Sequence, residues 1–424
     1  LCVPNDENEF TSPSQKEIER IMGENLHGKD LNASKVLAFQ SKAPDPPELN
    51  SWRELSLFHS GYPQPMGFQN PLKVVYSHSK TPSTKSSSRY IPQAPDRILD
   101  APDILDDYYL NLVDWNANNI LAVALNDALY LWNATTGTIE RLFTLEGNDY
   151  ICSVSWMTDG ATHLAVGNSL GSVQLWDCTT MKSVRKMAGH SARVSSLCWN
   201  SYVVTSGARS GVINHYDVRQ RDYQVATVSG GHTQEVCGLK WSPDGKYLAS
   251  GGNDNMLCVW PVAGGEKHSQ PQPLYSFSAH QAAVKALSWC PWQPNILASG
   301  GGTADRTIRF WNCNTGVCLN TLDTKSQVCS LQWSSTYKEL VSGHGFSNHQ
   351  ITIWRYPALS KVAELTGHTA RVLHLAMSPD GSTILSAGAD ETLRLWKCFM
   401  PDPTKKKEPT EVKVENSIFR RGIR

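Results

Sequence analysis

A segment that recurs about every 40–50 residues constrains the fold of this chain more than any other feature. Its fullest copy begins at Gly231-His232, passes through a Ser-Pro-Asp-Gly turn at 242–245 and closes at Trp260. A second copy runs in the same order from Gly367-His368 to Trp396. Within each copy, apolar and polar residues alternate in short runs separated by turn residues, which is typical of antiparallel strands and not of a helix. The chain is therefore predicted to be all-β.

An aromatic residue closes each copy and so counts the repeats. Gly-His near the start and Trp-Asp at the end are the signature of WD repeats, and each repeat supplies one four-stranded blade of a β-propeller. Closure of a ring hides the sheet edges that would otherwise pair with other chains. The predicted fold is a seven-bladed WD-repeat β-propeller, because seven closing aromatics are present: Trp132, Trp176, Tyr216, Trp260, Trp311, Trp354 and Trp396.

The repeats divide the chain into three parts. Residues 1–94 are rich in Pro, Ser and Lys and are predicted to be a flexible arm, residues 95–400 to be the propeller, and residues 401–424 to be a flexible tail. In the arm, a capping box at Ser14–Glu17 precedes a short predicted helix, which either folds on a partner or is transient. Residues 96–101 are predicted to supply the outer strand of the last blade and so to close the ring. Because the chain opens on Leu1, it is expected to be part of a longer protein.

The charge balance and the cysteines limit the class of partner. Lys and Arg together number 39, as do Asp and Glu, so no net charge points to nucleic acid or to an anionic membrane. The sequence has no signal peptide and no apolar run long enough to span a membrane. The 11 cysteines are interpreted as small buried residues of a reducing compartment. A soluble intracellular protein with no nucleic-acid or membrane partner is expected.

Histidine, serine and aspartate recur in several copies, and a catalytic triad is the alternative to weigh. A nucleophile is needed once, whereas these residues return in copy after copy. His190, His232, His280 and His368 are therefore interpreted as structural, each hydrogen-bonded inside its own blade to Ser or Thr, Trp and Asp. The sequence has no phosphate-loop spacing and no Cys/His cluster with zinc spacing. No catalytic residue, metal or cofactor is predicted, and the chain is not expected to be an enzyme.

The residue just before the innermost strand of each copy is predicted to lie at one rim of the channel. Aligning the copies places these residues there: Tyr109, Tyr150, Arg193, Glu235, Ala283, Gln327 and Arg371. Nearby loops add Asn253, Asn255 and Thr303. Arginines, tyrosines, amides and a hydroxyl suit a short polar peptide. Solvated loops are also polar, however, and the alignment alone does not separate the two interpretations.

Longer stretches of the sequence resemble the Fizzy family of activators of the anaphase-promoting complex, a ubiquitin ligase. They are Arg97 to Trp115, Glu235 to Trp241, Ser250 to Asn255, Trp289 to Trp292, Lys338 to Gly345 and the terminal Ile423-Arg424. The resemblance covers roughly residues 35–424 and is far more specific than a WD pattern. It implies a non-enzymatic adaptor that recruits substrates such as cyclins and securin to the ligase and helps to activate it.

The resemblance also implies two substrate-binding sites. Asp100 and Glu391 would bind the Arg of an Arg-x-x-Leu destruction box at the seam between blades seven and one, where ring closure brings them together. Without the resemblance this carboxylate pair would be an ordinary surface feature. Arg371 would pair with the Glu of a Lys-Glu-Asn degron. The full receptor for that degron would be Asp107, Tyr108, Asn253, Asn255, Thr303, Gln327 and Arg371.

Two motifs outside the repeats are implied to bind partners. The first resembles the motif that binds spindle-checkpoint proteins and comprises Lys35, Val36, Leu37, Phe39 and Pro44. From its pattern alone it is either a strand that adds to a partner's sheet edge or a chance apolar run. Ile423 and Arg424 resemble the dipeptide that docks on a TPR subunit of the ligase. The first motif favours the mitotic Fizzy branch over the Fizzy-related branch, and a location in nucleus and cytoplasm is expected.

The chain departs from the family pattern at the activating C-box. Arg89 to Pro92 reads Arg-Tyr-Ile-Pro, but Ser88 precedes it and Gln93 follows it, and it lies where the family carries a second, degron-like copy. The true C-box is therefore expected upstream of Leu1. Two other classes of function stay open. One is a scaffold propeller in chromatin or trafficking, whose rim binds unrelated peptides, and the more distant one is a hydrolase propeller.

Overall fold

The computed structural model describes residues 89–158, 160, 162–262 and 272–400. The chain divides into two units, Leu1–Ser88 and Arg89–Arg424. The predicted helix after Ser14, the checkpoint motif at 35–44 and the terminal Ile423-Arg424 lie outside the described residues. Residues 89–94, assigned to the arm from sequence, belong to the same unit as the repeats.

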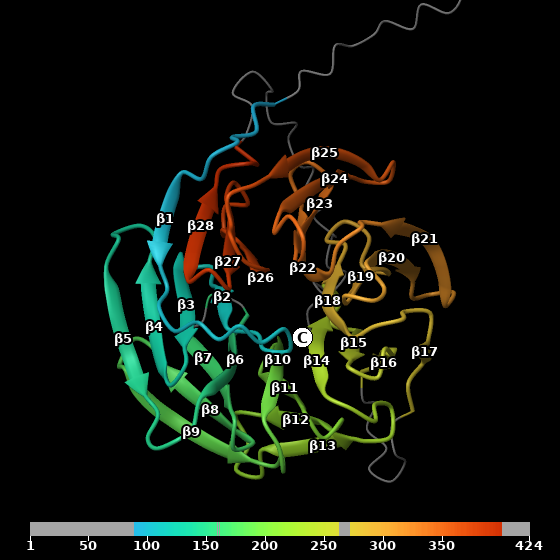
Figure 1. The fold of residues 1–424 in the computed structure, drawn as a ribbon. Helices are drawn as coiled ribbons and strands as arrows, with labels where there is room; N and C mark the ends of the chain where they lie inside the picture. Colours follow the sequence, from blue (N-terminus) through green and yellow to red (C-terminus); the bar gives the residue numbers. More distant parts are fainter. Residues whose placement is uncertain (1–88, 159, 161, 263–271, 401–424) are drawn as a thin grey trace, which may run out of the picture. The chain divides into compact units, whose positions relative to one another are not determined.

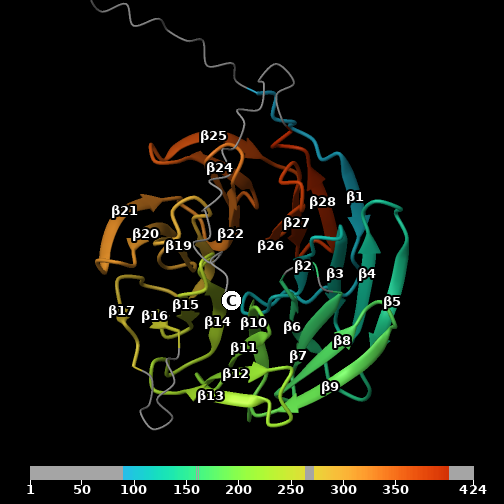
Figure 2. The ribbon, with the colours of Figure 1, turned by 180° about the vertical axis from the view of Figure 1, so that it is seen from behind.

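Seven four-stranded antiparallel sheets are arranged as a ring around a channel (Figure 1; from behind in Figure 2). Blade one holds β2 (Val113–Trp115), β3 (Ile120–Leu125), β4 (Ala128–Asn133) and β5 (Ile139–Thr144). Blade two holds β6 (Ile151–Trp156), β7 (His163–Asn168), β8 (Ser172–Asp177) and β9 (Lys182–Ala188). Blade three holds β10 (Val194–Asn200), β11 (Val203–Ala208), β12 (Ile213–Asp217) and β13 (Gln224–Val228). Blade four holds β14 (Val236–Trp241), β15 (Tyr247–Gly252), β16 (Leu257–Pro261) and β17 (Tyr275–Phe277).

The remaining three blades follow the same plan. Blade five holds β18 (Val284–Trp289), β19 (Ile296–Gly301), β20 (Thr307–Asn312) and β21 (Val317–Asp323). Blade six holds β22 (Val328–Ser334), β23 (Glu339–His344), β24 (Ile351–Arg355) and β25 (Ser360–Leu365). Blade seven holds β26 (Val372–Met377), β27 (Ile384–Gly388), β28 (Thr392–Trp396) and β1 (Arg97–Asp100). The predicted seven-bladed propeller is confirmed, and the closing aromatics all lie on the third strand of their blades.

The turn between β14 and β15 shows why the repeat carries Ser-Pro-Asp-Gly. Gly245 has a φ of 68°, which an L side chain adopts only with strain. Its N–H donates to the Ser242 carbonyl at 2.9 Å. The Asp244 carboxylate accepts hydrogen bonds from the Ser242 hydroxyl and the Lys246 N–H. The same geometry returns at Gly381, so the repeated turn sequence fixes the connection between the two inner strands.

The ring is closed by the outer strand of blade seven. β1 pairs antiparallel with β28, with Asp100 opposite Thr392. Beyond the strand, the Ala101 N–H donates to the Glu391 carbonyl at 2.8 Å. The prediction that residues 96–101 complete the last blade is therefore confirmed.

Hydrogen-bonded groups inside the blades account for the recurring histidines. His232 contacts the Ser250 hydroxyl at 2.8 Å and the Asp254 carboxylate at 3.1 Å, and the Trp260 indole N–H donates to the same hydroxyl. Burial alone would lower the pKa of His232, but the hydrogen bond to Asp254 raises it to about 9. His280 and His368 make the same set of contacts. The structural interpretation of these three residues is confirmed.

Blades three and six depart from that arrangement. His190 contacts Ser206 and Asn214 instead of an aspartate, and burial lowers its pKa to about 4. In blade six, His344 on β23 contacts the Ser342 hydroxyl, which also accepts the indole N–H of Trp354. A histidine on the second strand thus takes this place in blade six, where the link before the first strand, residues 324–327, contains no histidine.

Apolar side chains fill the spaces between neighbouring blades. One cluster joins blades two and three through Val173, Leu175, Val194, Val204 and Tyr216, all nearly inaccessible to solvent. The ten cysteines among the described residues are all free, and most are buried, as predicted. In the same part of the chain, no helix is long and apolar enough to cross a membrane.

Candidate functional site

The segment between β1 and β2 crosses one face of the ring and reaches its middle (Figure 1). Ala101, Ile104, Leu110 and Leu112 are buried along it. Tyr109 was aligned as the residue directly before the first inner strand, but β2 begins at Val113, so the expected start of this strand is wrong, although Tyr109 does lie at the rim. The physical reason is that the link from β1, the outer strand of blade seven, spans residues 101–112 and runs through the channel mouth before β2 begins.

Tyr108 anchors this segment in the channel mouth. Its hydroxyl lies 3.3 Å from the Ala283 carbonyl and 3.2 Å from the Val328 carbonyl, in blades five and six. Burial raises the pKa of Tyr108 well above its usual value. The amine of Lys285 lies 5.7 Å from the centroid of the Tyr108 aromatic ring. This amine donates a hydrogen bond to the Leu373 carbonyl. Burial lowers the pKa of this lysine to about 8. Tyr108, packed against the buried Lys285 amine, thus lines the channel mouth.

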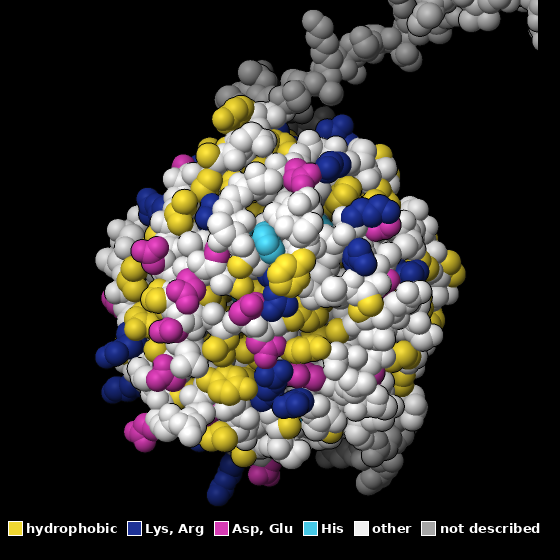
Figure 3. Space-filling model, viewed as in Figure 1, with side chains coloured by type: hydrophobic (Ala, Val, Ile, Leu, Met, Phe, Trp, Pro, Cys, Tyr) yellow, Lys and Arg dark blue, Asp and Glu magenta, His cyan; other side chains and the backbone are white. Residues whose placement is uncertain are grey.

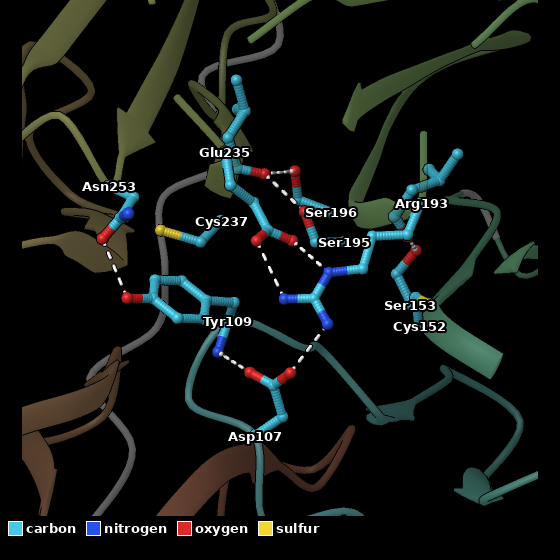
Figure 4. A network of polar contacts seen from close by, with 12 residues as sticks. Asp107, Tyr109, Cys152, Ser153, Arg193, Ser195, Ser196, Glu235, Cys237 and Asn253 are labelled. Atoms are coloured by element: carbon cyan, nitrogen blue, oxygen red, sulfur yellow. Dashed lines mark hydrogen bonds and ion pairs between the residues drawn. The ribbon is translucent and has the colours of Figure 1, made fainter. Parts of the chain in front are cut away.

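One half of the rim is a closed ionic network (Figure 4). The Arg193 guanidinium makes two hydrogen bonds to the Glu235 carboxylate, at 2.7 and 2.8 Å, and a third to Asp107 at 2.8 Å. Only 6% of the Glu235 side chain is exposed. Burial would lower the pKa of Arg193, but its bonds with Glu235 and Tyr150 and the nearby carboxylates outweigh burial and raise it. Both charges are satisfied by protein groups.

The other half of the rim holds an open pocket of about 640 Å³. It lies between the segment that crosses the ring and blades four to seven. All seven residues that the family resemblance assigns to the Lys-Glu-Asn receptor line it. Neither the alignment of the repeats nor the family resemblance named Asp106, although the resemblance named its neighbour Asp107. The other lining residues are Asp106, Tyr109, Ala282, Ala283, Gly302 and Ala304.

Arg371 is the cation of this pocket, and its carboxylate partner is exposed. The guanidinium bonds to the Asp106 carboxylate and, at 3.2 Å, to the Asp106 backbone carbonyl. The Asp106 side chain is 57% exposed. The guanidinium also lies 5.7 Å from the ring centroid of Phe346, whose side chain is exposed. A carboxylate from a ligand can therefore reach this arginine by displacing a solvated side chain.

Three of the residues that line this pocket carry polar side-chain groups without hydrogen-bond partners among the described residues. The side-chain oxygen of Gln327 is buried and has no hydrogen-bond partner in the part of the chain that the structure describes. The side chains of Asn255 and Thr303 also make no hydrogen bond to another described residue. Asn253 is already engaged, since its amide oxygen accepts from the Tyr109 hydroxyl and its amide donates to Gln234. Buried polar atoms left unpaired are costly, so this half of the rim is suited to a polar ligand.

The seam between blades seven and one carries the two carboxylates of the second predicted site. Asp100 ends β1 and Glu391 directly precedes β28, so the register of these strands brings them together. Both side chains are exposed. Neither takes part in an ion pair or side-chain hydrogen bond with another described residue. They form a solvent-accessible acidic pair.

Charged side chains of both signs surround the middle of the face seen in Figure 3. This mixture agrees with the absence of net charge in the whole chain. Within residues 89–400, apart from the gaps in the description, no group of three or more His, Cys, Asp and Glu side chains could hold a metal ion. The fold and this site together define a WD-repeat propeller with a polar pocket at its channel mouth.

Comparison with known proteins identifies the family within this class. Residues 99–396 match the family model of the CDC20/Fizzy WD40 domain. The chain is 51% identical over 389 residues to the "Anaphase-promoting complex subunit cdc20" of Dictyostelium discoideum, covering 89% of this chain and 74% of the relative. It is 47% identical over 405 residues to "Cell division cycle 20.1, cofactor of APC complex" of Arabidopsis thaliana, covering 95% and 83%. The chain therefore belongs to the CDC20/Fizzy family.

Two further matches show how far the similarity extends. "Protein FIZZY-RELATED 2" of Arabidopsis thaliana is 51% identical over 333 residues, covering 78% of this chain and 67% of the relative. A chain in the structure titled "Crystal Structure of Mitotic Checkpoint Complex" is 41% identical, with a TM-score of 0.70, covering 87% of this chain and 99% of the other. The match to Cell division cycle 20.1 covers 95% of this chain, so it must include most of residues 1–88. The match to the Fizzy-related protein is shorter and covers 78%.

Proposed function

We propose that this protein is a substrate-recognition adaptor and activator of the anaphase-promoting complex. The names of its two cell-division-cycle relatives support this role, since both are described as a subunit or cofactor of that complex. The longer matches to these relatives than to the Fizzy-related protein favour the mitotic branch. The likeness to a chain of the mitotic checkpoint complex supports checkpoint proteins as partners of the motif at 35–44, while Ile423-Arg424 is proposed to dock on a TPR subunit.

The pocket beside Arg371 is the observation that carries the proposal. A Lys-Glu-Asn tripeptide offers one carboxylate, one amide and several backbone groups. Its Glu would bond to the Arg371 guanidinium in place of Asp106, as a charge-assisted and bidentate pair. Its amide and backbone would meet the unpartnered side chains of Asn255 and Thr303, and a peptide N–H would satisfy the buried oxygen of Gln327. In this arrangement Asp107 and Tyr108 fix the shape of the pocket, since their polar atoms are already bonded to the propeller.

The acidic seam is proposed to bind the arginine of a destruction box. Asp100 and Glu391 are exposed and neither forms an ion pair with a described residue, so a guanidinium would meet two available carboxylates. Because the seam lies on the side of the ring and the pocket at its mouth, the two sites would bind their ligands independently.

Binding of a fluorescent Lys-Glu-Asn peptide, followed by anisotropy, tests the proposal. Arg371→Ala is expected to weaken binding roughly 30- to 1000-fold, the usual cost of about 2–4 kcal/mol for a buried, charge-paired hot spot. Glu391→Ala is the matched control and should leave this peptide unaffected while weakening an Arg-x-x-Leu peptide. A Lys-Gln-Asn peptide should lose most of its affinity for the unsubstituted chain and be nearly insensitive to Arg371→Ala.

The outcome also separates the adaptor from a generic scaffold. If neither peptide binds at millimolar concentration, the receptor hypothesis fails and a scaffold whose rim binds other peptides becomes the better explanation. If Arg371→Ala affects the Lys-Gln-Asn and Lys-Glu-Asn peptides equally, the proposed pairing of Arg371 with the peptide carboxylate is wrong.

A further inference from the structure

Arg89 is held at the end of the ring opposite to the rim pocket. Its guanidinium forms a two-point pair with the Glu339 carboxylate, at 3.0 and 2.5 Å, and donates through Nε to the Cys398 carbonyl at 2.6 Å. The guanidinium carbon lies 4.1 Å from the ring centroid of Tyr337 and 5.0 Å from that of Phe399. Arg89, which the sequence placed in the flexible arm, is thus enclosed by one carboxylate, one carbonyl and two aromatic faces.

These groups form what we call the arginine socket, made by Tyr337, Glu339, Cys398 and Phe399. The Arg89 side chain is 10% exposed and that of Glu339 only 3%. A planar, weakly hydrated guanidinium suits stacking on aromatic rings together with a bidentate bond, whereas an ammonium does not. Because Glu339 is so deeply buried, it would remain a costly unpaired carboxylate without a cation. The socket therefore selects arginine over lysine.

The segment that fills the socket is held mainly by side chains. Ile91, two residues after Arg89, packs on the cluster that contains Trp396 and Phe399. Between them the Tyr90 side chain is 86% exposed. Among the described residues, no backbone hydrogen bond precedes the one from Asp96 to Leu395. The requirement read from these contacts is an arginine, any residue, and then an aliphatic residue. Because no backbone hydrogen bond to another described residue holds residues 89–92 in place, a segment of another protein with the same side chains could make the same contacts.

We propose that the arginine socket is a peptide-binding site that Arg89 occupies in cis, and that it binds an Arg-x-aliphatic segment of another protein when residues 89–92 leave it. The segment is then an intramolecular competitor of the partner. Two features support binding in trans: the buried carboxylate demands a cation, and the present occupant is attached through two side chains only. This site is separate from the rim pocket and from the acidic seam, and does not depend on their proposed ligands.

The test uses the full chain and a labelled peptide, Ser-Ser-Arg-Tyr-Ile-Pro-Gln, that copies residues 87–93. The Arg89→Ala chain, whose socket is empty, is expected to bind this peptide at least about 10-fold more tightly than the unsubstituted chain, whose socket is filled. A peptide with citrulline in place of arginine should lose about 30-fold or more, because the side chain keeps its shape but not its charge. Glu339→Gln in the Arg89→Ala background should abolish binding.

The controls keep the result interpretable. Arg97→Ala removes a neighbouring arginine that lies over Trp132 outside the socket, and it should not improve binding of the peptide. Thermal unfolding and binding of an Arg-x-x-Leu peptide report whether each variant has kept its fold. The proposal is overturned if the folded Arg89→Ala chain binds the peptide no better than the unsubstituted chain, or if Glu339→Gln or citrulline makes no difference.

Discussion

Arg193 and Arg371 stand at equivalent positions of blades three and seven, each directly before an inner strand, yet their surroundings differ. Arg193 is bonded to the buried Glu235 and to Asp107, so its donors are used within the protein. Arg371 is bonded to Asp106, a solvated residue of the segment that crosses the ring. The repeat therefore fixes where a rim side chain begins, but its partner decides whether it stabilises the ring or remains available to a ligand.

The largest expected effect is a difference in the free energy of unfolding between the Arg193→Ala and Arg371→Ala variants. Arg193→Ala would leave Glu235 buried and unpaired, and we expect it to destabilise the propeller by about 3–5 kcal/mol. Arg371→Ala loses only a pair with an exposed carboxylate and should cost about 1 kcal/mol or less. Chemical unfolding followed by tryptophan fluorescence measures both. Similar losses for the two variants would show that the rim is not divided in this way.

A smaller effect is expected when the carboxylate beside Arg371 is neutralised. Asp106→Asn removes the anion that competes with a ligand carboxylate, so a Lys-Glu-Asn peptide should bind about 3- to 10-fold more tightly. Titration by anisotropy measures the change, and Asp103→Asn, an exposed acid of the same segment, is the matched control. Weaker binding after Asp106→Asn would mean that Asp106 positions Arg371 for the ligand and does not compete with it.

The smallest expected effect concerns the amine beneath Tyr108. Because burial lowers the pKa of Lys285 to about 8, this amine is charged below that pH and neutral above it. The charge attracts a ligand carboxylate, so affinity for the Lys-Glu-Asn peptide should fall about 2- to 3-fold between pH 7 and pH 9. Lys285→Met should remove the dependence, and a Lys-Gln-Asn peptide should not show it. Affinity that rises or stays constant over this range in the unsubstituted chain would contradict the assignment.

The fold could be predicted almost entirely from the sequence, because the same pattern of strands and a closing aromatic residue recurs seven times. The closing aromatics counted the blades, and the turn at 242–245 fixed the connection of the inner strands. Six of the seven aligned rim residues do directly precede an inner strand. The exception is Tyr109, which lies in the link of residues 101–112 between β1 of blade seven and β2 of blade one.

The pairing of side chains could not be predicted in the same way. Arg371 and Asp106 are separated by 265 residues, and only the path of residues 101–112 across the channel mouth brings them together. Arg193 and Arg371 looked alike in the alignment for the same reason. Arg89 was assigned to the flexible arm because residues 1–94 are rich in Pro, Ser and Lys, and its carboxylate partner is 250 residues away. The roles of the pocket and seam residues came from the family resemblance, which is information about relatives and not about physical chemistry.

The pairing of β1 with β28 also has a consequence for folding during synthesis on the ribosome. β1 is made first but cannot find its partner until roughly 300 further residues have been added, which takes about 15–60 s at 5–20 residues per second. For that time it is an unpaired edge that could join the wrong chain. Its shortness and the charges of Arg97 and Asp100 at its two ends keep it soluble while it waits. The ring can only be completed when translation of the last blade is finished.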